Sequence, residues 1–118
     1  MIRPSLDSKV YLYTGRVDMR KSIDGLAALV QEGMLLDPME PIIFVFCNRA
    51  RDKIKCLYWE RNGFVLFYKR LEKDRFKWLS TRDSLTQVIN GQSLNWLLDG
   101  FDIFNNKPHQ SLYFKSVC

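Results

Sequence analysis

Residues 42–70 read IIFVFCNRARDKIKCLYWERNGFVLFYKR, and this stretch decides the fold. Ile42–Cys47 is a continuous apolar run with β-branched residues, typical of a strand buried on both faces. Ile54–Glu60 and Phe64–Arg70 are predicted as two further strands, because Arg61-Asn62-Gly63 between them has the composition of a tight turn. Connections this short require antiparallel neighbours.

On the N-terminal side of this stretch, the pattern predicts one strand and one helix. Val10–Tyr13 is the strand, and apolar residues recur at helical intervals over about Arg20 to Glu32. Asp18 is expected to cap the helix, since its carboxylate can accept the free N–H groups of the first turn. Gly33 is expected to end it.

On the C-terminal side, Arg75–Leu79 is predicted as an edge strand, and Asn90 as the cap of a short leucine-rich helix that Gly100 closes. Residues 105–118 read as a loosely ordered tail. The expected fold is therefore a single α+β domain over residues 1–104. It consists of an antiparallel meander of about four to five strands, with an amphipathic helix after the first strand and a short C-terminal helix, the helices covering a face.

Composition indicates an ordinary soluble domain. The chain has 118 residues, 47% of them hydrophobic and 26% charged, with no apolar run long enough for a membrane span. Near the N-terminus, Pro4, Asp7 and Lys9 stand where a signal peptide would need an apolar stretch, which favours a cytoplasmic protein. Three irregularly spaced cysteines suggest reduced thiols, with Cys47 and Cys56 in buried strands.

The net charge of +5 is concentrated in one segment. Residues 49–82 contain eleven Lys and Arg against four Asp and Glu, a local charge of +7, while each flank sums to −1. Aromatic residues are interleaved with these cations, as on surfaces that bind phosphates. The alternative is a set of solvated strand edges, where cations discourage edge-to-edge pairing.

Catalytic groups are scarce. The single histidine, His109, falls in the predicted tail, so neither a histidine-based triad nor a multi-histidine metal site is possible. The cysteines lack metal-ligand spacing, and the glycines form no phosphate-binding loop. We therefore expect neither a cofactor nor an enzyme. A residual hypothesis is a small magnesium-dependent nuclease using Asp18, Asp24 or Glu60.

Two cationic clusters are candidates for phosphate contact. The first is at the predicted helix start, where a phosphate would meet free N–H groups as well as Arg20 and Lys21; alternatively, Arg20 only pairs with Asp18 or Asp24. The second is an exposed loop from Arg49 leading into Lys55, which could straddle a duplex backbone. The predicted nucleic-acid contacts are Arg20, Lys21, Arg49, Arg51, Lys53, Lys55, Arg61, Lys69, Arg70 and Arg75.

Three segments carry a family resemblance: DMRKSIDGL at 18–26, RDKIKCLYWERNG at 51–63 and YKRLEK at 68–73. With the leucine-rich segment LNWLLDGFD, the chain from about Val10 to Asp102 closely resembles the accessory TnpB family, the second open reading frame product, of bacterial insertion sequences of the sixty-six group. It departs from the family pattern at Cys47, Cys56 and Ser22, the last where glycine is common, and in a longer asparagine-containing tail.

The resemblance implies a non-enzymatic protein encoded beside a DDE-type transposase and needed for movement of the element. Its expected partners are DNA, bound without sequence specificity, the element's transposase and another element-encoded accessory protein. An alternative is a protein-interaction module that binds the transposase without touching DNA, using the basic face and aromatic anchors.

Overall fold

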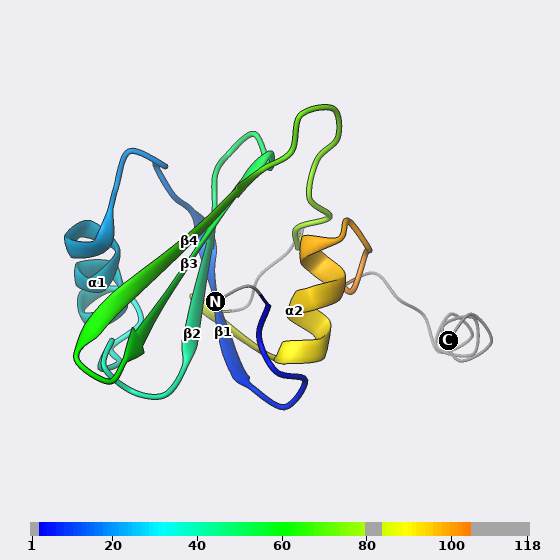
Figure 1. Cartoon of the computed structure of the whole chain (residues 1–118). Coiled ribbons are helices and arrows are strands. Elements are labelled where there is room, and N and C mark those ends of the chain that lie inside the picture. Colours follow the sequence, from blue (N-terminus) through cyan, green and yellow to red (C-terminus); the bar gives the residue numbers. More distant parts are fainter. Residues whose placement is uncertain (1–2, 80–83, 105–118) are drawn as a thin grey trace.

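A computed structural model describes residues 3–79 and 84–104 and confirms the α+β class (Figure 1). Five strands form one sheet in the order β4-β3-β2-β1-β5. The strands are β1 (Lys9–Arg16), β2 (Ile43–Cys47), β3 (Lys53–Glu60), β4 (Gly63–Arg70) and β5 (Thr86–Asn90). The helices are α1 (Ile23–Glu32), after the first strand, and α2 (Gly91–Leu98), near the C-terminal end of the described chain.

The sheet is mostly antiparallel, but it differs from a simple meander at one pair. β1 and β2 are parallel, because α1 carries the chain back to the end of the sheet where β1 began. The helices were expected to cover one face of the sheet. Instead, α1 covers one face and α2 covers the other (Figure 1). Every residue of β2 is buried, which confirms the prediction of a strand covered on both sides.

The predicted start of the first helix was wrong. α1 begins at Ile23, three residues after Arg20, and Ser22 occupies the N-cap position without a side-chain hydrogen bond. The Asp18 carboxylate instead accepts the backbone N–H of Arg20 at 2.9 Å and shapes a turn ahead of the helix. Gly33 ends the helix, as predicted.

The β3–β4 hairpin is confirmed, with a different residue in the strained position. Glu60 pairs with Gly63, so Arg61 and Asn62 alone form the loop. The positive φ of 56° is at Arg61 rather than in the Asn-Gly dipeptide. Gly63 is the first residue of β4.

The segment predicted as an edge strand, Arg75–Leu79, is irregular chain. Phe76 and Trp78 are buried in the core on the α2 face, and the N–H of Phe76 donates to the carbonyl of Arg51 at 2.7 Å. The aromatic alternation thus reflects burial against the sheet, without pairing into it. The second edge of the sheet is instead β5, which the sequence pattern did not predict.

α2 begins as predicted: the Asn90 side-chain oxygen accepts the N–H of Ser93 at 2.8 Å. Gly91 lies so close to the N-terminal segment that a Cβ there would overlap the carbonyl oxygen of Ser5. Asp99 is the C-cap, and Gly100 follows with a φ of 97°. Among the described residues, neither helix has the length and apolar character needed to cross a membrane.

The two buried cysteines lie in the core between the sheet and α2, and both are free thiols. Burial raises the pKa of Cys47 and that of Cys56 to about 12. Their predicted burial is confirmed. Cys118, His109 and the rest of the predicted tail, 105–118, lie outside the described residues.

Candidate nucleic-acid interface

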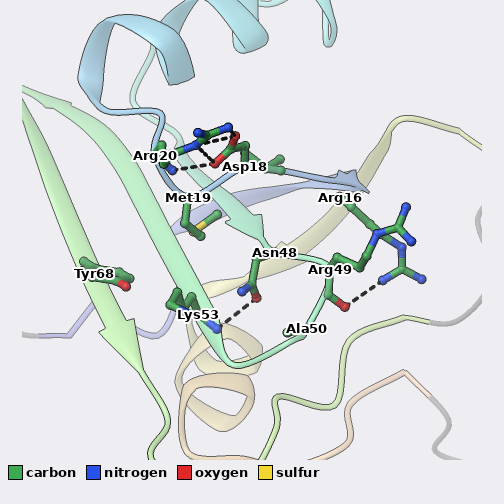
Figure 2. Close-up of a pocket in the computed structure, with 10 residues that line it drawn as sticks. Arg16, Asp18, Met19, Arg20, Asn48, Arg49, Ala50, Lys53 and Tyr68 are labelled. Carbon is green, nitrogen blue, oxygen red and sulfur yellow. Dashed lines mark hydrogen bonds and ion pairs between the residues drawn. The ribbon is translucent and has the colours of Figure 1, made fainter.

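A hollow of about 720 Å³ lies at one end of the sheet, where β1 and β2 end and β3 begins (Figure 2). Because β1 and β2 are parallel, their carboxyl ends are adjacent, with Arg16 paired to Cys47. Residues 16–20 form one wall and residues 48–50 another, and Lys53 and Tyr68 complete the lining. In open α/β sheets, the carboxyl ends of adjacent parallel strands are where ligands bind.

Arg16 connects the two walls. Its Nη1 donates to the carbonyl of Arg49 at 3.2 Å, and next to it the N–H of Val17 donates to the carbonyl of Cys47 at 3.0 Å. Both arginine side chains are exposed at the rim of the hollow. Arg16 was not among the predicted contacts, because it lies in the slightly acidic N-terminal flank, 33 positions before Arg49.

Arg20 forms an ion pair with Asp18 (Figure 2). This pairing was the predicted alternative to a phosphate contact. Its Nη2 donates to Oδ2 at 2.7 Å, and its Nε lies 3.1 Å from Oδ1 and 3.0 Å from Oδ2. These hydrogen bonds lower the pKa of Asp18 to about 2. The Arg20 side chain is nevertheless 91% exposed, so it remains accessible from solvent.

The loop between β2 and β3 is held by Asn48. Its Oδ1 accepts the N–H groups of Asp52 and Lys53 at 3.2 and 3.1 Å, and its Nδ2 donates to Asp52 at 2.7 Å. The hydrogen bond from the Asn48 amide, and to a lesser extent the contact with Lys53, lower the pKa of the Asp52 carboxyl. Arg51 adopts a positive φ of 63° at the bend. The bend leaves Arg49 and Ala50 exposed toward the hollow.

Lys55 is not exposed, although it was predicted as part of a basic loop. It is 9% exposed, and its Nζ donates to the carbonyls of Met19 and Lys21, each at 2.8 Å. The same ammonium lies 5.2 Å from the centre of the Tyr68 ring. Lys55 therefore holds the turn before α1 against β3, with its ammonium bound to backbone carbonyls.

The other predicted contacts are dispersed. Lys21 is exposed beside the turn, while Arg61 lies at the opposite end of β3. Lys69 lies on the α2 face, where its Nζ donates to the carbonyl of Leu98 at 2.7 Å. Arg70 pairs with Glu72 at 2.8 Å, and Arg75 donates to the carbonyl of Ala50 at 2.7 Å.

The lining of the hollow therefore combines four cations, Arg16, Arg20, Arg49 and Lys53, with one carboxylate, Asp18. Lys53 also contacts Asp52 at 3.3 Å. Three of the four cations were predicted from the sequence. The parallel pairing of β1 and β2 adds the fourth.

The carboxylates of the nuclease hypothesis come from different segments, with Asp24 in the first turn of α1. Asp18 is bound to Arg20, and Glu60 lies at the far end of β3. Within residues 3–79 and 84–104, His, Cys, Asp and Glu side chains form no group of three that could hold a metal ion.

Comparison with known proteins identifies the family. The family model described as IS66 Orf2 like protein matches residues 8–108. Two similar proteins of Sinorhizobium fredii (strain NBRC 101917 / NGR234), the uncharacterized proteins y4jC and y4hO, are 33% and 34% identical over 102 residues. These alignments cover 86% of this chain, and 86% and 88% of the two relatives. No solved structure matches the chain. With nearly its whole length matched, the chain belongs to the IS66 Orf2-like (TnpB_IS66) family of insertion-sequence accessory proteins.

Proposed function

We propose that this accessory protein acts in transposition without catalysis and contacts DNA through the basic hollow at the end of β1 and β2. One observation carries the proposal: four cations from three separate segments surround a concave surface of about 720 Å³. Cations on a concave surface bind a polyanion more effectively than the same cations scattered over a convex one.

The contacts available in the hollow suit the DNA backbone better than base edges. A guanidinium group binds phosphate through two parallel hydrogen bonds. The hollow has three such groups, on Arg16, Arg20 and Arg49. Phosphate contacts position a protein on DNA and carry no sequence information. We therefore expect binding that is independent of sequence and strongly dependent on salt.

The test is duplex binding by the full chain, measured by mobility shift or anisotropy over a series of salt concentrations. Four phosphate contacts predict a slope of log Kobs against log[salt] of about −3.6, since each contributes about −0.9. Arg16→Gln/Arg49→Gln removes two of these contacts and should reduce the slope to about −1.8.

The matched control is Lys9→Gln/Arg61→Gln, which removes the same charge at the opposite end of the sheet and should leave the slope near that of the wild type. An equal reduction of the salt slope in the two double variants would mean that DNA binding depends on the net charge of the protein and not on the hollow. Absence of duplex binding at low salt would refute the proposal.

One observation favours a second candidate, in which the same basic surface binds an acidic surface of the element's transposase. Tyr68 is exposed beside the cations, and tyrosine and arginine are enriched as anchors of protein interfaces. Co-purification with the transposase that survives nuclease treatment at low salt would favour this candidate, and loss of the complex on nuclease treatment would exclude it.

A further inference from the structure

Tyr68 is the aromatic side chain that lines the hollow. It lies on β4 opposite Lys55, with its side chain on the α1 face of the sheet. Phe64 and Leu66, on the same face of the same strand, pack into the core beneath α1. Tyr68 is instead 49% exposed, because it lies beyond the part of the sheet that α1 covers.

The ring of Tyr68 is held in place. The Lys55 ammonium lies 5.2 Å from the ring centre and is itself fixed by the carbonyls of Met19 and Lys21. A cation over one face of an aromatic ring stabilises that position of the ring. A ring ordered in advance loses little conformational entropy when a planar ligand stacks on its exposed part.

Cations line the same hollow as this ring. Lys53 is on the same face of β3, one diagonal step from Tyr68 in the strand register, and Arg16 and Arg49 lie across the hollow from the ring (Figure 2). The volume of about 720 Å³ is within the range of sites that hold ligands of nucleotide size. An aromatic platform inside a cationic groove is the arrangement that binds single-stranded nucleic acid.

A duplex cannot use this platform, because its bases are stacked on one another and present only their edges in the grooves. An unpaired strand can place a base on Tyr68 while its phosphates contact the arginines. Stacking of one base on an aromatic side chain is worth about tenfold or more in affinity.

We infer that the hollow selects unpaired DNA, with Tyr68 as the stacking platform for one base and the cations of the hollow as the contacts for the phosphates of the same strand. The inference rests on the proposed DNA contact and specifies its substrate. It gives this accessory protein a preference for DNA whose strands have been separated, over intact duplex.

The experiment compares labelled oligothymidylate of about 20 nucleotides with a blunt duplex of the same length, by fluorescence anisotropy at one salt concentration. We expect the full wild-type chain to bind the single strand about tenfold more tightly than the duplex. Tyr68→Ala should remove this tenfold preference and change duplex affinity less than twofold. Tyr68→Phe keeps the ring and should keep the preference.

Phe101→Ala is the matched control, because Phe101 is 47% exposed and follows α2 on the other side of the sheet; it should change neither affinity. A second measurement does not depend on any variant: an abasic strand of equal length carries the same phosphates and should bind the wild type about tenfold more weakly than oligothymidylate.

Equal binding of the abasic and thymidine strands, or equal effects of Tyr68→Ala on single strand and duplex, would overturn the inference. Duplex binding with the expected salt slope would then leave the proposed function intact. If neither single strand nor duplex binds at low salt, the proposed function fails as well.

Discussion

At the scale of single residues, Asp18 has two effects on the hollow. It orients the guanidinium of Arg20, and it adds the one carboxylate among the residues that line the cavity. An anion approaching Arg20 must therefore share it with Asp18. The ion pair is exposed to water, so its effect is on the local charge of the hollow more than on folding.

The titration of Asp18 tests this pairing. Its pKa is lowered from 3.8 to about 2 by the hydrogen bonds from Arg20, so the stabilising contribution of the pair is complete above about pH 4 and is lost as the pH falls toward 2. Carbon-13 NMR of the Asp18 carboxyl should show this midpoint in the folded protein, and Arg20→Ala should return it toward 3.8. A midpoint near 3.8 in the wild type would show that the pair is absent in solution.

At the scale of secondary-structure elements, Lys55 links the turn before α1 to the sheet. Its stem lies among buried residues of β3, and its ammonium takes two carbonyl oxygens of the turn as acceptors. These carbonyls belong to Met19 and Lys21, on either side of Arg20. Lys55 thereby positions a residue of the hollow without facing the hollow itself.

Replacing Lys55 by Met keeps an apolar stem and removes the donor. We expect a loss of about 2–3 kcal/mol in the free energy of unfolding, because two carbonyls lose a charged partner. Urea denaturation measures this loss, and Lys73→Met is the control, since Lys73 is exposed and its replacement should cost less than about 0.5 kcal/mol. Equal stability of the two variants would contradict the structural role of Lys55.

The separate elements were largely predictable from local signals. The buried β2 run, the hairpin before Gly63 and the Asn90 cap all depend on residues close together in the chain. The pattern failed for β5, a short and mostly exposed strand that exists because it pairs with β1, more than 70 positions earlier. It also failed at 75–79, because burial in the core on the α2 face of the sheet produces the same alternation as strand pairing.

At the scale of the whole molecule, the fold divides the basic segment. Lys53 and Arg49 lie at the hollow and Lys69 lies on the α2 face. Arg61 follows the far end of β3, which is about 23 Å from Lys53 at ~3.3 Å per residue. The cations that give residues 49–82 their local charge of +7 therefore do not form a single surface. A cation from outside the segment, Arg16, completes the hollow.

The core on the α2 face of the sheet contains two cysteine thiols whose reactivity can be predicted. Cys47 and Cys56 are buried, with pKa values raised to about 12, so at pH 8 they should react with a thiol reagent only when the whole domain unfolds. In a Cys118→Ser background, absorbance assays should find both thiols protected in buffer and both reactive in denaturant. Rapid labelling of one thiol in the native protein would show that the core opens locally.

Periodicity, turn residues and charge along the chain were enough to predict the α+β class, the strands β1 to β4, both helices and the excess of cations. Three features became visible only in the folded chain: the parallel pairing of β1 and β2, the burial of Lys55 and the hydrogen bond from Arg16 to Arg49. The physical reason is that these features depend on which distant segments pair and which face each helix covers. Such long-range contacts leave no periodic signal in any one segment.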